Sequence, residues 1–412
     1  MLSFLDYYLV PFGLFLGATT PQIAVLVAVP HLLSAMAQLF AVGVVRRVGS
    51  RLKLIVRGAA LQAALFIPTA FLAVIPSPRR VQWLPVLIAG IRMMGSLVGA
   101  AWGSLVSEYL PPERRGSYFG WRARVVGIAG VVGVVCGGLL LTWLGKFSTA
   151  LGFFLLFLLA GVLRFISAAL LAQMTELPHS FSPGSDFTLL MFLRRMKKSN
   201  FVRFVLFTAG VIFAAHIAAP YFSVYLLRGL HWSYLQYMWI HLAAVIAGLV
   251  AFPVWGRHAD FVGNAHILKL TGFLIPLIPF LWLFSESNLY LFGVELFSGF
   301  VWGGFNLCAA NFIYDAVTPQ KRVRCLAYFN LINGTAIFIG SLLGGFLADR
   351  LPPIRGHSLL TLFALSGLLR LGACFFLSSR FQEVRASARR VSSRRLFFSV
   401  LGIRPLLEPE TE

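Results

Sequence analysis

Four ionisable side chains stand inside long apolar stretches of this chain, where a charge is costly. They are Asp6, Arg92, His216 and Glu295. An ionisable group in a bilayer core costs about 2.5 to 3.5 kcal/mol on insertion scales, so membrane proteins place such groups sparingly. A carboxylate in these surroundings can be tuned to load and release a proton near neutral pH. The two acids and Arg92 therefore indicate a site for protons or a polar solute, and an interior ion pair that only holds helices together is the alternative.

Two helical faces combine a charge with aromatic, small or amide side chains. The residues follow one another at spacings that place them on one face of a helix: Arg92, Gly95, Gly99 and Trp102 in one stretch, and Glu295, Trp302 and Asn306 in another. Either face could hold a substrate. For Arg92 the competing interpretation is a structural pair with a neighbouring carboxylate, and for Glu295 it is a position near the outer mouth.

The histidines are more ambiguous. His216 precedes Pro220 by one turn, where the proline frees a carbonyl group or lets the helix bend during gating. A lone membrane histidine can also be only a hydrogen-bond donor between helices. His31 and His241 are expected to be peripheral.

A polar segment from Trp255 to Asn264 separates two apolar stretches and predicts a tight hinge between membrane helices. Its spacing is Gly256, Asp260 and Gly263. The glycines allow close backbone approach or a positive φ, and the aspartate can cap a helix or face an arginine.

The elements that must position these residues are membrane helices. The 412-residue chain is 58% hydrophobic and 12% charged, and apolar runs of about 20 residues, each long enough to span a bilayer, recur along it. We expect an all-α polytopic membrane protein with twelve helices at about 2–18, 22–45, 54–75, 84–106, 122–144, 147–171, 201–227, 234–255, 266–284, 288–313, 326–348 and 358–378. The four cysteines have no metal or redox spacing, which favours packing roles.

Membrane topology explains the net charge of +21. Most lysine and arginine residues fall in alternate loops and after residue 379, and the positive-inside rule makes that face cytoplasmic, with both termini on it. Nucleic-acid binding is therefore not expected. The basic segment from Arg385 to Ile403 predicts a helix on an anionic leaflet, and disorder is the alternative.

The chain repeats itself after six helices. Residues 207 positions apart match: Pro112, Arg115, Gly127, Gly133, Gly137 and Gly138 fall on Pro319, Arg322, Gly334, Gly340, Gly344 and Gly345. The unit is a duplicated six-helix bundle in one orientation. The predicted parts are bundles at 1–172 and 201–378, a cytoplasmic linker at 173–200 and a basic tail at 379–412. Arg164 and Arg370 also correspond, and are interpreted as structural residues that snorkel or pair with Glu108 or Asp315.

These motifs resemble the major facilitator superfamily over nearly the whole chain. The Trp255 to Asn264 hinge is similar to the family's signature between helices 8 and 9. The segments Pro111 to Gly116 and Asn311 to Arg322 resemble its loops between helices 4 and 5 and between helices 10 and 11. The resemblance implies two six-helix bundles around a central cavity lined by helices 1, 4, 7 and 10, which carry Asp6, Arg92, His216 and Glu295.

The resemblance also implies gating roles at the cytoplasmic loops. The expected gating residues are Gly256, Asp260, Gly263, Arg115, Asp315 and Arg322. The first-half hinge departs from the pattern, because Arg46 stands where the second half has Asp260. The expected latch is therefore asymmetric. The first helix is also short, so either the start of the chain is placed too far downstream or the first helix does not reach the cytoplasmic surface.

The function expected from all of this is secondary transport of a small organic solute by alternating access, coupled to protons. No phosphate-binding loop, catalytic triad or metal cluster is found, so neither an enzyme nor a cofactor is expected. The alternative is a non-transporting sensor or assembly factor on the same fold. The expected partners are a small-molecule substrate, protons and the lipid bilayer of a bacterial inner membrane, and the chain is expected to act as a monomer.

Overall fold

The computed structural model describes residues 2–176, 199–385 and 391–400, and most of the predicted linker lies outside them. In these ranges the chain forms helices and loops, with one isolated bridge between Ile354 and His357. The first part contains α1 (Leu2–Phe15), α2 (Thr20–Val48), α3 (Arg51–Phe71), α4 (Arg80–Tyr109), α5 (Pro112–Leu144) and α6 (Thr149–Leu171). The second contains α8 (Asn200–His216), α9 (Ala219–Val224), a π-helical turn η1 (Tyr225–Gly229), α10 (Tyr234–Val262), α11 (Asn264–Leu274), α12 (Leu277–Leu281), α13 (Asn288–Ala316), α14 (Pro319–Ala348), α15 (Ser358–Leu377), a 3₁₀ turn η2 (Ser378–Arg380) and α16 (Ser393–Val400).

The described helices confirm a polytopic membrane protein. Eleven helical segments are long and apolar enough to cross a membrane, and a shorter apolar helix, Phe4–Phe15, corresponds to the first predicted span. This short helix ends before Gly17, which has φ +88°. Glycine tolerates this left-handed conformation because it has no Cβ.

Several helices are longer than the apolar runs predicted. Helix α10 continues to Val262 rather than residue 255, α5 begins at Pro112 rather than residue 122, and α14 begins at Pro319 rather than residue 326. The extra turns are polar and charged. Such residues form helices readily in water, so a boundary drawn at the first charge cuts the helix short.

Two of the spans are interrupted. The seventh span breaks between α8 and α9 directly after His216, where a bend is predicted, and the ninth breaks between α11 and α12 at Ile275 and Pro276. Proline explains both positions, because Pro220 and Pro279 lack the N–H that would continue the helical bonding.

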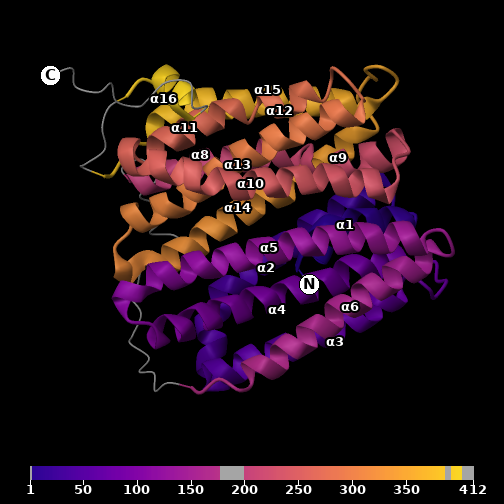
Figure 1. The fold of residues 1–412 in the computed structure, drawn as a ribbon, viewed down its shortest axis with the longest axis horizontal. Coiled ribbons are helices and arrows are strands. Elements are labelled where there is room, and N and C mark those ends of the chain that lie inside the picture. Colours follow the sequence, from indigo (N-terminus) through magenta and orange to yellow (C-terminus); the bar gives the residue numbers. More distant parts are fainter. Residues whose placement is uncertain (1, 177–198, 386–390, 401–412) are drawn as a thin grey trace. The chain divides into compact units, whose positions relative to one another are not determined.

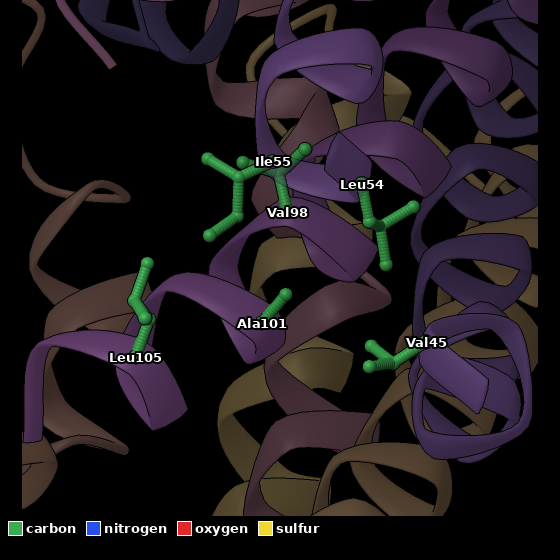
Figure 2. Packing of buried hydrophobic residues seen from close by; sticks show 6 residues of the cluster. All are labelled: Val45, Leu54, Ile55, Val98, Ala101 and Leu105. Carbon is green, nitrogen blue, oxygen red and sulfur yellow. The ribbon is translucent and has the colours of Figure 1, made fainter. Parts of the chain in front are cut away.

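The chain divides into two compact units. The first comprises Met1–Gly184, His216–Leu242 and Asn330–Leu362, and the second comprises Ser185–Ala215, Ala243–Phe329 and Phe363–Glu412. In the first unit α2 packs on α4, and α3 packs on both α4 and α6, as Figure 1 shows for α3 and α6. Its core includes one cluster where α2, α3 and α4 meet, drawn in Figure 2 and formed by Val45, Leu54, Ile55, Val98, Ala101 and Leu105.

The second unit is held by close helix packing and aromatic contacts. Helix α13 approaches α10 at glycines: a Cβ on Gly299 would overlap the backbone of Ala244, and one on Gly303 would lie 2.9 Å from the Cβ of Ala251. Small residues allow such approach in membranes. The segment that follows α15, Ser378–Arg385, returns along this unit and buries Phe381 against Phe204 and Phe207. We call it the C-terminal strap.

Candidate functional site

Asp6 and Arg92 form an ion pair within the first unit. The Nη2 atom of Arg92 in α4 lies 2.8 Å from Oδ1 of Asp6 in α1, and the two side chains are 20% and 48% exposed, respectively. Ser34 of α2 donates a hydrogen bond to the backbone carbonyl of Arg92 at 3.2 Å, which fixes α4 against α2. Sequence analysis predicted both residues, and the structure brings them together as one partly accessible charged site between apolar helices.

Two histidines lie close to this pair, although sequence analysis expected both to be peripheral. His31 of α2 interacts electrostatically with Arg92, and its Nδ1 is 2.8 Å from the carbonyl of Val27. The ring of His241 lies 5.6 Å from that of Tyr7, the neighbour of Asp6, and 4.2 Å from that of Tyr237. The hydroxyl of Tyr237 in α10 donates to the carbonyl of Tyr7 at 2.8 Å, so α10 anchors the backbone next to Asp6. A single helix face could not reveal these neighbours, because they belong to other helices.

Trp102 is separated from Arg92 by ten positions along α4 and lies in a different environment. The guanidinium of Arg122 stacks on its ring at 4.2 Å, and Phe119 meets it edge to face. Trp102 also packs against the Val45 and Leu54 cluster. These contacts are those of a packing residue at the α4 and α5 ends, and Gly99 between the two residues has no neighbour near its Cβ position.

The predicted stripe on α13 separates into different environments. Glu295 is half-buried, and Arg370 of α15 lies within electrostatic range of its carboxylate. Trp302 is half-buried, with its ring 5.6 Å from that of Phe305, and Asn306 is exposed. Among the described residues, Glu295 is thus the member of the stripe that lies within electrostatic range of a second charged group.

The turn between α10 and α11 contains fewer residues than the sequence predicts. Helix α10 runs through Gly256 and Asp260, and the turn consists of Gly263 alone, with φ +87°. A Cβ on Gly263 would also overlap the carboxylate of Glu383, so glycine is required here for two reasons. A Cβ on Gly256 would meet only Leu307 at 3.9 Å, which is ordinary contact.

The carboxylates beside the hinge bind an arginine from the C-terminal strap. Arg385 Nε donates to Asp315 at 2.8 Å, and its Nη1 donates to Asp260 at 3.2 Å. Asn264 adds a hydrogen bond to Asp315 at 2.7 Å. Burial disfavours the charged guanidinium, but the bonds to Asp315 and Asp260 outweigh burial and raise the pKa of Arg385 above its ordinary value. Sequence analysis missed this residue because it placed the tail on the membrane.

The described contacts give neither of the two predicted gating arginines as a partner of Asp260 or Asp315. Arg322 donates to the carbonyl of Tyr314 at 3.1 Å and stacks on the Tyr314 ring, so it caps the end of α13. Arg115 lies in the first turn of α5, and its side chain is outside the described part of the structure.

The first unit contains a parallel arrangement. Arg51 at the start of α3 makes two hydrogen bonds to Glu108, each 2.7 Å long. Glu176 accepts from the backbone N–H of Arg51 at 2.6 Å and also binds the Ser50 hydroxyl. Burial would raise the pKa of Glu176, but the Ser50 hydroxyl and the N–H groups of Arg51 and Leu52 outweigh it and lower the pKa below its ordinary value. Glu108 is therefore not the partner of Arg164, which instead binds Gln62 at 2.7 Å.

The tail helix contacts protein in the second unit. Helix α16 packs against α11, Leu396 is buried, and Ser399 lies 3.2 Å from Nε2 of His258. The sequence predicts either a helix on a lipid surface or disorder for this segment. Neither prediction includes a contact with protein. Among the described residues no group of three His, Cys, Asp or Glu side chains could hold a metal ion.

The described helices define a class, that of polytopic helical membrane proteins. Comparison with known families supports this class directly. The profile of the Major Facilitator Superfamily matches residues 1–225 and again residues 204–408. The chain belongs to the Major Facilitator Superfamily, which makes it a secondary transporter by family and fold and not an enzyme.

Similar proteins agree with the family. An MFS-type transporter from Aspergillus terreus is 23% identical over 118 residues, which are 29% of this chain and only 21% of that relative. A mutant form of the nucleoside transporter NupG matches with TM-score 0.71 and 13% identity, over 92% of this chain and 98% of that one. The D-xylose-proton symporter matches with TM-score 0.69 and 13% identity, over 93% and 92% of the two chains. At these identities the likeness to solved structures shows the fold.

Proposed function

We propose that this protein moves a small polar organic solute across the membrane in exchange for, or together with, protons. The observation that carries the proposal is the 2.8 Å pair between Asp6 and Arg92. Both side chains remain partly exposed although they lie on apolar helices. A charged pair kept accessible in such surroundings is suited to binding rather than only to packing.

The chemistry follows from which group can titrate. Arginine stays protonated, so a proton taken up at this pair goes to the Asp6 carboxylate. Ionised Asp6 holds the Arg92 guanidinium in the pair. Protonation removes that charge and frees the guanidinium to bind an oxygen of the solute. Glu295 is a second carboxylate in the membrane-spanning part, and we propose that it takes part in proton coupling together with Asp6.

The solute class is suggested by similar folds and by the site. The fold neighbours include a nucleoside transporter and a D-xylose-proton symporter. Both nucleosides and pentoses carry hydroxyl groups that an arginine can bind as a donor. We therefore take a nucleoside and a pentose as the first probes for this chain. We further propose that residues 1–172 and 201–378 act as the two moving halves, in a bacterial inner membrane with both termini in the cytoplasm.

Uptake of labelled uridine and labelled D-xylose into proteoliposomes tests the proposal. A melting-temperature screen over other metabolites supplies further probes, because a ligand that binds only the folded state raises its stability. A pH gradient is expected to drive uptake above equilibrium, with the acidic side outside if the solute moves together with protons and inside if it moves in exchange for them. The variants Asp6→Asn and Asp6→Asn/Glu295→Gln are expected to retain exchange at equal concentrations and to lose the response to the gradient.

A matched control is Asp349→Asn, which changes an exposed carboxylate just after α14. This control is expected to transport like the wild type. Gradient-driven uptake that persisted in the double variant would exclude coupling through these carboxylates. A ligand that raises the melting temperature but is never moved in either direction would favour the non-transporting sensor instead.

A further inference from the structure

Two positions that correspond in the two halves carry different residues beside the hinge glycines. Arg51 comes two positions after Gly49, and Ala265 comes two positions after Gly263. Each donates its backbone N–H to a glutamate that follows the last long helix of its half, at 2.6 Å and 2.7 Å respectively. The backbone arrangement is thus repeated, but the side chain of Arg51 has no counterpart at position 265.

In the first half, Arg51 binds the carboxylate near the end of α4. Its Nη1 and Nη2 atoms lie 2.7 Å from the two oxygens of Glu108, which is the two-pronged geometry of a strong arginine–carboxylate pair. The corresponding acid of the second half is Asp315, and α11 contains no arginine that could bind it. Arg370, which the sequence offers as a partner of Asp315, donates instead to a serine hydroxyl and to backbone carbonyl groups.

Arg385 supplies the missing cation from the C-terminal strap. Its Nε lies 2.8 Å from Oδ2 of Asp315 in α13, and its Nη1 lies 3.2 Å from Oδ1 of Asp260 in α10. The first half has Arg46 in place of Asp260, so only the second half has two acids to neutralise beside its hinge. One guanidinium therefore offsets two carboxylates that would otherwise repel each other.

The strap fixes the position of Arg385 through the residues that precede it. Phe381 is buried against two phenylalanines of α8. The side chain of Asn200, also in α8, bonds to both the carbonyl and the N–H of Gln382, each at 2.8 Å. Glu383 accepts from the N–H of Arg385 at 3.0 Å. The strap is thus anchored on α8, and its arginine binds the ends of α10 and α13.

We propose that Arg385 is a positioning residue for gating, which supplies from the tail the cation that α11 lacks and holds the ends of α10 and α13 together. This proposal rests on the proposed transport function. In the first half the cation belongs to a membrane helix, whereas in the second half it belongs to a segment after the last span. Without the arginine, Asp260 and Asp315 lose their shared counter-charge, the ends of α10 and α13 move apart, and the strap detaches from α11.

Hydrogen–deuterium exchange of the purified full-length protein tests this inference without any substrate. The measured segments are residues 263–270 and 378–385, which lie on the two sides of the contact between α11 and the strap. Arg385→Gln is expected to raise the exchange rates of both segments roughly tenfold, because the loss of charge-assisted hydrogen bonds favours local opening. Arg380→Gln changes an exposed arginine of the same strap and should exchange like the wild type. Equal rates in Arg385→Gln and the wild type would overturn the inference.

Two further variants separate the charge of Arg385 from a general structural defect. Arg385→Lys keeps the charge, so its exchange rates should lie closer to those of the wild type than to those of Arg385→Gln. In the background Asp260→Asn/Asp315→Asn the arginine has no carboxylates to offset, and adding Arg385→Gln should change the rates by less than about twofold. Rates in Arg385→Lys as fast as in Arg385→Gln would contradict the proposal, as would a tenfold effect that persists without the two acids.

Solute exchange in proteoliposomes, with uridine and D-xylose as probes, supplies the functional readout. Arg385→Gln should exchange solute more slowly than Asp260→Asn, because it leaves both carboxylates without their partner. Arg380→Gln should exchange solute like the wild type, and unchanged solute exchange in Arg385→Gln would exclude a gating role for Arg385. A wild type that moves neither probe but shows the expected hydrogen-exchange pattern would instead count against the proposed transport function alone.

Discussion

The carboxylate of Glu383 accepts a hydrogen bond from the backbone N–H of Ala265 at 2.7 Å, which joins the C-terminal strap to the first turn of α11. Glu176 does the same for the N–H of Arg51 at the start of α3, at 2.6 Å. The two glutamates are 207 positions apart, the same separation as the repeated loop residues. A carboxylate at a helix N-terminus satisfies a free N–H group and the helix dipole. The duplication therefore extends to the caps of the third and ninth spans.

Replacing Glu383 by glutamine should weaken the strap. The amide can still accept a hydrogen bond, but it loses the charge that the helix N-terminus favours. We expect Glu383→Gln to lower stability by about 1 kcal/mol, which lowers the melting temperature by roughly 2–4 °C. Thermal unfolding in detergent measures this, with Glu286→Gln in the exposed loop before α13 as the control. A shift no larger than that of the control would mean that the strap does not depend on this cap.

The cap at Glu176 should depend on pH. Its pKa is lowered by folding, so the ionised carboxylate stabilises the folded state above its ordinary value of 4.5, and the contribution is lost as the pH falls through the lowered value. Wild type should therefore be more stable than Glu176→Gln at neutral pH, and the difference should shrink below pH 4.5. Melting temperatures across this range measure the effect. A constant difference at all pH values would contradict the assigned cause.

The two hinge glycines should respond differently to alanine. Gly49 and Gly263 have φ values of +73° and +87°, and left-handed backbone costs a residue with a Cβ about 1–2 kcal/mol. The Cβ position at Gly49 is open, whereas the one at Gly263 overlaps the Glu383 carboxylate. Gly263→Ala should therefore lower the melting temperature more than Gly49→Ala, because it adds displacement of the cap to the same backbone strain. Equal shifts would show that the Glu383 contact adds nothing.

The sequence predicts the membrane helices well because a span requires a long apolar run that no loop needs. It predicts their ends poorly, as at Val262, because charged turns outside the bilayer continue a helix without any hydrophobic signal. It also predicts the two interrupted spans only in part. Pro220 predicts a bend, but the sequence does not predict the break at Ile275, since a proline in an apolar run keeps the hydropathy of a continuous span.

The sequence also predicts the residues of the candidate site only in part. Asp6 and Arg92 are found from the sequence because a charge in an apolar run is visible without knowing its neighbours. Their relation to His31 is not, because it depends on how α2 lies against α4. Arg385 was missed for a related reason. It lies in a segment with several arginines, and the sequence does not show which of them binds a carboxylate. Only the folded C-terminal strap places Arg385 against Asp315.

The two acids at the hinge should contribute unequally to the latch with Arg385. The Asp260 side chain is 77% exposed and its bond to Arg385 is 3.2 Å long, while that of Asp315 is 22% exposed and its bond is 2.8 Å long. Exposed pairs contribute between about 0 and 1 kcal/mol, so Asp260→Asn should change the melting temperature little. Asp315→Asn removes the charge from the better buried acceptor of both Arg385 and Asn264 and should cost about 1–3 kcal/mol. A transport measurement distinguishes a gating role from a role in stability. Asp260→Asn should slow solute exchange in proteoliposomes although its melting temperature is nearly normal. Unchanged exchange would show that Asp260 has no role in gating.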